Sequence, residues 1–222
     1  MRRRSTESNR VYQEFDFLTD VDAKRLQLIG AISLAWNWLE GAIDAALGMA
    51  LELHPSMWLE VSGRVNGMDA KLGIIRASVC LFDGTIPVET QNLVKQTLTH
   101  VGDHKKLRDG VIHVRLVHPD AEVAETPQRR TNVDEVLISA AALQGLYDRL
   151  NLLAKEANEV AIYFKDRWLI QHTESDETRT QAAASFRQSM ALLLDLQKRR
   201  VALPPLPEFP ATPQATPSSE EG

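Results

Sequence analysis

The feature that most constrains this chain is a long stretch of apolar residues spaced three and four positions apart. Between residues 20 and 53 this spacing places seven of them on one face of a single helix: Ile29, Ile32, Trp36, Leu39, Ile43, Leu47 and Ala50. Asp20 or Asp22 can cap its start, and Pro55 ends the pattern. The stripe must face a core, and three glycines in or near it would let another helix approach closely: Gly30, Gly41 and Gly48.

The same periodicity recurs in four later segments, separated by turn-forming or polar residues. It predicts helices over residues 68–82, from 88 to about 113, 133–170 and 182–200. The breaks fall at residues 83–87, 119–132 and 173–178, and two of them contain proline. Because no segment sustains the alternation typical of a strand, we predict an all-α bundle of about four to five helices.

The length suits one globular domain with appendages. We expect a flexible basic arm over residues 1–18, a helical domain over 19–172, an additional helix over 173–201 and a tail over 202–222. Six prolines among the last nineteen residues predict that the tail is extended and disordered. The N-terminus is basic but lacks the apolar region of a signal peptide, and no run is apolar enough to cross a bilayer.

Composition limits the classes of function. A formal net charge of −5 argues against a protein that coats nucleic acid indiscriminately, because such binding depends on many cationic contacts to phosphate. A single cysteine, Cys80, fits the reducing cytoplasm, and its apolar neighbours indicate a buried thiol. A local basic site remains compatible with this charge, and one dense cluster exists: His100, His104, Lys105, Lys106, Arg108, His113 and Arg115.

The most informative motif lies in this cluster and reads RDGVIH over residues 108–113. A guanidinium cation matches phosphate oxygens, and histidine can take or give a proton near neutral pH. The segment can therefore bind a phosphate and move a proton. A second arginine with the same spacing, Arg167 before His172, is followed by Trp168 instead of a polar residue, and we interpret it as background.

These residues resemble the HEPN superfamily of helical nucleotide-binding domains. The resemblance covers residues 20–171: a long first helix bearing the sequence WNWLE at residues 36–40, a helix ending in Arg-Asp-x3-His, a polar loop and a long closing helix. Many members are metal-independent ribonucleases of toxin or defence systems that dimerise across the motif. The resemblance implies that Arg108, Asp109 and His113 are the catalytic residues, although Asp109 stands where asparagine is commoner and Ile112 where a small residue is.

Helix geometry gives a separate argument for a homodimer. On a regular helix Arg108 and His113 diverge by roughly 140°, whereas Asp109 and His113 lie about 40° apart. A two-fold axis could bring Arg108 of one copy near His113 of the other. His113 would then assist removal of a ribose 2′-hydroxyl proton while Arg108 stabilises charge on the phosphoryl oxygens, a reaction that needs no metal or other cofactor.

Simpler interpretations stand beside these hypotheses. Arg108 and His113 could simply cap the C-terminal end of the helix. His100 and His104 have the spacing of a metal-binding pair, although a solvated basic face is the favoured interpretation of these two histidines. The tryptophans are more typical of core than of base stacking. We expect candidate substrate-binding residues at Lys105, Lys106, His104, Arg115 and Glu40, with Glu40 suggested by the resemblance.

Two alternatives to the ribonuclease remain open at this point. One is a non-catalytic helical dimer that binds a nucleotide or a protein partner, and the other is a sensor of a small nucleotide. If the protein is a toxin, an antitoxin or a regulatory protein would be its partner. The sequence predicts a cytoplasmic protein and no membrane association.

Overall fold

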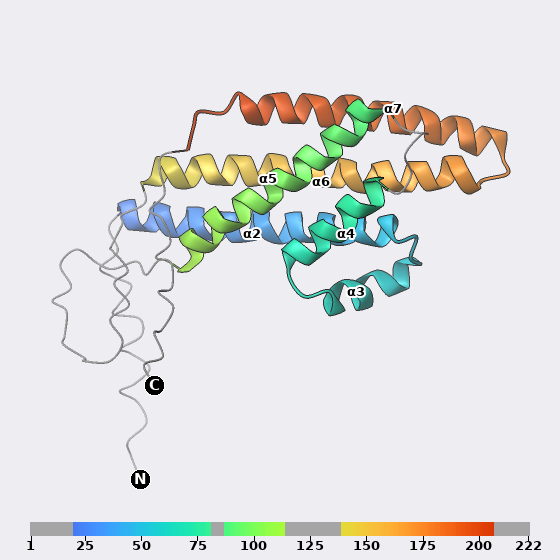
Figure 1. Cartoon of the computed structure of the whole chain (residues 1–222). Helices are drawn as coiled ribbons and strands as arrows, with labels where there is room; N and C mark the ends of the chain where they lie inside the picture. Colours follow the sequence, from blue (N-terminus) through green and yellow to red (C-terminus); the bar gives the residue numbers. More distant parts are fainter. Residues whose placement is uncertain (1–19, 81–86, 114–138, 207–222) are drawn as a thin grey trace, which may run out of the picture.

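The computed structural model describes residues 20–80, 87–113 and 139–206 (Figure 1), and all the regular secondary structure in these ranges is helical. Six helices are described: α2 (Asp20–Ala50), α3 (Pro55–Arg64), α4 (Met68–Cys80), α5 (Val88–His113), α6 (Ala140–His172) and α7 (Asp176–Val201). The predicted all-α class is confirmed. Among these helices none has the length and apolar character required to span a membrane.

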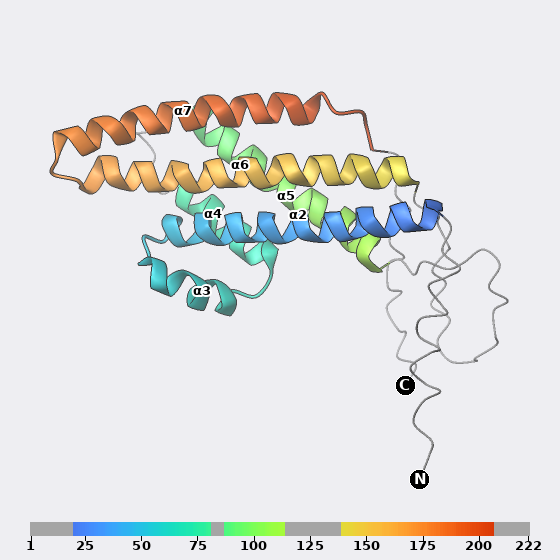
Figure 2. The same cartoon turned by 180° about the vertical axis from the view of Figure 1, so that it is seen from behind.

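The helices α2, α6 and α7 lie side by side with α6 in the middle (Figures 1 and 2). The α5 helix crosses them obliquely, and α3 and α4 pack at one end of α2. Because α6 contacts both α2 and α7, buried residues lie on opposite sides of it, for example Leu152 and Ala161, which are nine positions and so about 180° apart. The crossing of α5 brings the segment 108–113 to the N-terminal half of α2.

The apolar stripe predicted for the first helix forms the core of the bundle. Five of its members are at most 1% exposed: Ile32, Trp36, Leu39, Ile43 and Leu47. They pack with apolar residues of α4, α5 and α6, and Met190 and Leu193 of α7 belong to the same cluster. The division proposed at residues 172 and 173 therefore falls between two helices that share one core.

Serine side chains cap the N-terminal ends of α6 and α7. Ser139 accepts a hydrogen bond from the backbone N–H of Ala142 at the start of α6, and Ser175 accepts one from Thr178 at the start of α7. Each serine satisfies an amide that the first helical turn leaves unpaired. The helix predicted over residues 182–200 begins six residues earlier, at Asp176, because Ser175 caps it and Asp176 and Glu177 favour its N-terminus.

The region after α2 also differs from the prediction. The α2 helix ends at Ala50, and a further helix, α3, begins at Pro55, so Pro55 starts a helix as well as ending the earlier pattern. A β-carbon added at Gly48 would lie 2.5 Å from Trp58 of α3, which confirms the close approach predicted there. Gly30 and Gly41, in contrast, face open space within the described chain.

The beginning of the predicted disordered tail is ordered against α6. Arg149 of α6 donates hydrogen bonds to the carbonyls of Leu203 and Pro204, and Leu206 packs against the core. Gly145 permits this contact, since a β-carbon there would lie 3.1 Å from Leu206. The prediction of disorder was therefore wrong for residues 202–206. The rest of the tail, the N-terminal arm and the predicted start of α6 at residues 133–138 lie outside the described residues.

Candidate functional site

The motif found in the sequence lies at the C-terminal end of α5. The helix continues without a break through Gly110 to His113, its last residue. The backbone is therefore regular over the motif, which is the condition that the angular argument made from the sequence requires. Arg115, a candidate substrate-binding residue, lies outside the described residues.

Arg108 is directed toward α2. Its guanidinium carbon lies 5.0 Å from the centre of the Trp36 ring, and its Nη1 donates to Oδ1 of Asp109 at 2.7 Å. The side chains of Arg108 and Asp109 are 25% and 38% exposed, so both reach solvent. This cation lies over an aromatic face beside a carboxylate, an arrangement that favours a fixed guanidinium over a freely rotating one. Its contacts differ from those of a simple helix cap.

Trp36 links Glu40 to the same site. The Trp36 indole N–H donates to Oε1 of Glu40 at 2.7 Å, while the ring itself is 1% exposed. Glu40 is half-buried and lies one helical turn after Trp36. Glu40, suggested by the family resemblance, therefore connects to Arg108 through the indole ring. No pattern in the sequence indicated that Trp36 contacts Arg108.

The two candidate lysines of α5 have different surroundings. Lys105 Nζ lies 2.8 Å from Oδ2 of Asp69 on α4. This hydrogen bond raises the pKa of Lys105 and lowers the pKa of the Asp69 carboxyl. Lys106 is exposed. An anion in solvent would therefore meet Lys106 directly, whereas at Lys105 it would compete with the Asp69 carboxylate.

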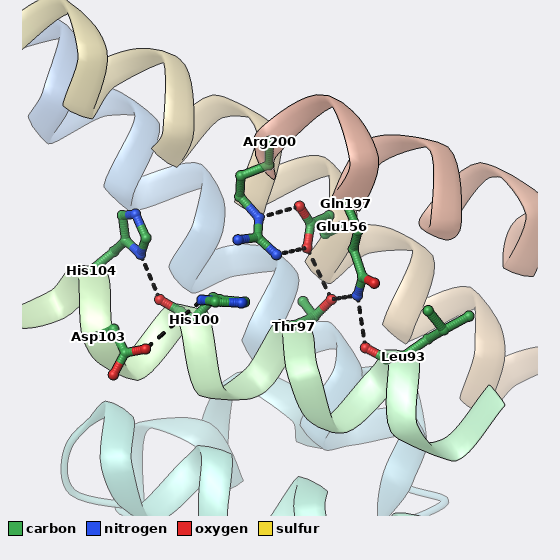
Figure 3. Close-up of polar contacts among 8 residues, drawn as sticks. All are labelled: Leu93, Thr97, His100, Asp103, His104, Glu156, Gln197 and Arg200. Carbon is green, nitrogen blue, oxygen red and sulfur yellow. Dashed lines mark hydrogen bonds and ion pairs between the residues drawn. The ribbon is translucent and has the colours of Figure 1, made fainter. Parts of the chain in front are cut away.

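His104 lies apart from this surface, in the junction of α5 with α6 and α7 (Figure 3). The residue is 8% exposed, its Nδ1 pairs with the carbonyl of His100 at 2.8 Å, and its Nε2 is buried without a hydrogen-bond partner in the described chain. Burial lowers the pKa of His104, and the nearby charge of Arg200 lowers it further. The prediction of a solvated basic face is therefore wrong for His104, which is buried, while Lys106 is exposed as such a face requires.

The same junction contains a buried polar network that the sequence analysis missed (Figure 3). Arg200 of α7 donates from Nε and Nη2 to the Glu156 carboxylate of α6, at 2.6 and 3.3 Å. Thr97 of α5 donates to Glu156 at 3.0 Å, and Gln197 donates to Thr97 and to the Leu93 carbonyl. Glu156 is 0% exposed and Arg200 5%. A sequence signal existed, because Glu156 interrupts an apolar stripe of α6.

The second arginine–histidine pair has no comparable arrangement. Arg167 is buried in α6, where burial lowers the pKa of its guanidinium and Tyr163 hydrogen-bonds to it. His172 is exposed at the end of the helix, where its ring stacks on Trp168. Trp168 and Trp38 are 43% and 57% exposed, so the expectation of core tryptophans holds for Trp36 and not for these two.

No group of three or more potential ligands among the described residues could hold a metal ion. Comparisons with protein-family models, curated proteins and solved structures found no match to this chain.

Proposed function

We propose that this protein is a metal-independent endoribonuclease of the HEPN toxin or defence type, with Arg108, Asp109 and His113 as its catalytic residues. The observation that carries the proposal is the placement of Arg108, which is held between Trp36 and Asp109 at the helix end that bears His113. A guanidinium oriented in this way is suited to recognise a phosphodiester. The resemblance of the sequence supplies the reaction class, and the expected setting is the cytoplasm.

The chemistry is an internal transesterification of RNA. His113 accepts the proton of a ribose 2′-hydroxyl, and the 2′-oxygen forms a bond to the adjacent phosphorus. The bond from phosphorus to the 5′-oxygen breaks, and that oxygen leaves as a hydroxyl after taking a proton from an acid or water. Arg108 stabilises the negative charge that develops on the phosphoryl oxygens. The products are a 2′,3′-cyclic phosphate and a 5′-hydroxyl.

The proposed active form is a homodimer with a composite site. Arg108 points toward α2 of its own subunit, and helix geometry turns it away from the direction of His113. A two-fold axis near the end of α5 would place His113 of one copy beside Arg108 of the other. Light scattering at micromolar concentration tests this, and a strictly monomeric mass contradicts the composite site.

Asp109 sets the availability of Arg108. Its carboxylate occupies Nη1 of Arg108, so a substrate phosphate must compete with it. Replacing it as Asp109→Asn removes the competing charge and introduces the residue that is commoner in the resembling family. Activity should be preserved or increased if Asp109 only modulates Arg108, and should fall if Asp109 orients His113.

The deciding experiment measures cleavage of single-stranded RNA in EDTA. We expect products with 2′,3′-cyclic phosphate ends and no cleavage of the matching DNA, which lacks the 2′-hydroxyl. Arg108→Ala and His113→Ala should each abolish cleavage, whereas the exposed His172→Ala should retain it. Growth arrest and total-RNA integrity in cells expressing wild type or His113→Ala provide the second readout. Cleavage that disappears in EDTA contradicts the mechanism.

A second candidate function is that of a non-catalytic dimer or partner-binding module, and one observation supports it. Leu34 and Trp38, one turn apart on α2, are 51% and 57% exposed, and Gly30 and Gly41 near them face open space. Exposed apolar side chains beside small residues suit contact with another protein, such as an antitoxin. A well-folded dimer that cleaves no RNA, and whose association is weakened by Trp38→Ser, would favour this function.

A further inference from the structure

The contact between Trp36 and Arg108 joins two elements that are distant in the sequence. Trp36 belongs to the core stripe of α2, and the guanidinium of Arg108 from α5 lies over the face of its ring. The negative face of an indole attracts a cation electrostatically, and this attraction strengthens where water is excluded. Trp36 is 1% exposed, so water is excluded from its ring. The ring therefore attracts the Arg108 cation in addition to packing in the core.

Glu40 fixes the orientation of this ring. A buried indole N–H requires an acceptor, and Glu40 provides a charged one at 2.7 Å. The hydrogen bond prevents rotation of the indole, and a carboxylate at the N–H edge polarises the ring in the direction that favours a cation on its face. The Trp36 indole is therefore hydrogen-bonded to Glu40 through the N–H at its edge, and its face contacts the guanidinium of Arg108.

The hydrogen bonding of Arg108 shows why the ring matters for its position. Its Nη1 bonds to Asp109, the next residue on the same helix, and its Nε is buried without a hydrogen-bond partner in the described chain. Contact with an adjacent side chain constrains the guanidinium weakly relative to the rest of the fold. The Trp36 ring is the contact that fixes it relative to α2.

We propose that Trp36 is a positioning residue for Arg108, with Glu40 holding the indole in place. The proposal rests on the proposed function for its consequence, since a displaced guanidinium would stabilise the developing charge poorly. It also makes a claim independent of catalysis, namely that the Arg108 side chain is ordered by the Trp36 ring. These two claims can be tested separately.

The first measurement is NMR of the arginine Nε–Hε groups, with the Arg108 signal assigned by its loss in Arg108→Lys. In the wild type we expect a ring-current shift of this signal and restricted motion of the side chain. Trp36→Leu should remove both, and Trp36→Phe, which keeps an aromatic face, should retain part of them. The exposed Trp168→Leu on α6 is the control and should change neither. An Arg108 signal that is unaffected by Trp36→Leu overturns the proposal, whether or not RNA is cleaved.

The second measurement is cleavage kinetics at a temperature where urea titration shows each variant to be folded. Trp36→Leu should lower kcat about five- to thirty-fold, the loss expected for a desolvated cation–π contact, with a smaller change in KM. Trp36→Phe should retain much of the wild-type rate because it keeps an aromatic face. Glu40→Gln should do the same because it keeps an acceptor oxygen for the indole N–H. An unchanged kcat in folded Trp36→Leu, when Arg108→Ala abolishes cleavage, also overturns the proposal. Absence of cleavage by the wild type contradicts the proposed function instead, and the NMR result then decides the role of Trp36.

Discussion

The α5 helix carries two polar regions that differ in how completely their groups are paired. In its middle, Thr97 joins a network with Glu156 and Arg200 in which the charged groups are almost fully buried and hydrogen-bonded to one another. At its end, Arg108 and Asp109 are paired but partly exposed. Glu156 and Arg200 are too deeply buried to meet a ligand, whereas Arg108 and Asp109 reach solvent.

This difference separates a structural role from a chemical one. A buried ion pair forms only when its partners satisfy each other, because an unpaired charge in the interior is costly. A catalytic cation must keep donors for its substrate, and therefore has to be held by something other than hydrogen bonds alone. Under the proposed function, the aromatic face of Trp36 holds Arg108 in this way. Polar residues on one helix would then serve the fold at one position and a reaction at another.

The largest expected effect is on activity at the exposed end. His113→Ala should lower the rate of RNA cleavage about a hundred- to ten-thousand-fold, the usual contribution of a general acid or base. The free energy of unfolding should change little. Kinetics and urea titration of the same preparations measure both quantities. A loss of activity that parallels a loss of folded protein would place this residue with the structural region instead.

The next largest effect is on stability in the buried network. Arg200→Ala should lower the free energy of unfolding by about 3–5 kcal/mol, because it leaves the Glu156 carboxylate buried without its cation. Urea or thermal unfolding measures this loss. The double variant Glu156→Leu/Arg200→Leu removes both charges and should recover much of the stability. A cost below about 1 kcal/mol for Arg200→Ala, the range of an exposed ion pair, would contradict the buried pairing.

A smaller effect concerns pH. Burial lowers the pKa of His104 below its ordinary value of 6.5, so the unfolded chain binds a proton more readily than the folded one. Stability from this group is fully present above the ordinary value and is lost as the pH falls from there to the lowered pKa. Desolvation and Arg200 act on His100 in the same direction. Unfolding curves from about pH 7.5 to 5.5 should show this loss.

His104→Gln provides the control for the pH experiment. Over the same range its stability should fall less than that of the wild type, because one titrating group is absent. Equal pH dependence in the two proteins would show that protonation of His104 is not linked to unfolding.

The smallest effect is expected at the ion pair that α5 makes with α4. Lys105→Ala breaks the contact with Asp69, whose side chain is 74% exposed, so solvent screens most of the attraction. The free energy of unfolding should change by less than about 1 kcal/mol. A larger loss in urea titration would show that this pair, too, belongs to the structural network.

Local periodicity accounts for the part of the fold that could be predicted. Apolar residues at helical spacing identified α2, α4 and α5 to within a few residues, and the end of α6 to within two residues, because the residues of each stripe lie in consecutive turns. The α3 helix has ten residues, too few for a repeated stripe, and was missed. The first turn of α7 is polar, so the apolar pattern began later than the helix did, although Ser175 and the two acids after it are a recognisable start signal.

The sequence by itself determined the helices and drew attention to Arg108, Asp109 and His113, because helix periodicity and motif spacing are properties of neighbouring residues. Tertiary structure decided which charges are buried and which ring supports the arginine. Glu156 meets Arg200 only where α7 packs against α6, and Trp36 meets Arg108 only where α5 crosses α2. Their energies depend on exclusion of water and on distances between elements remote in the chain, and neither quantity is encoded in local spacing.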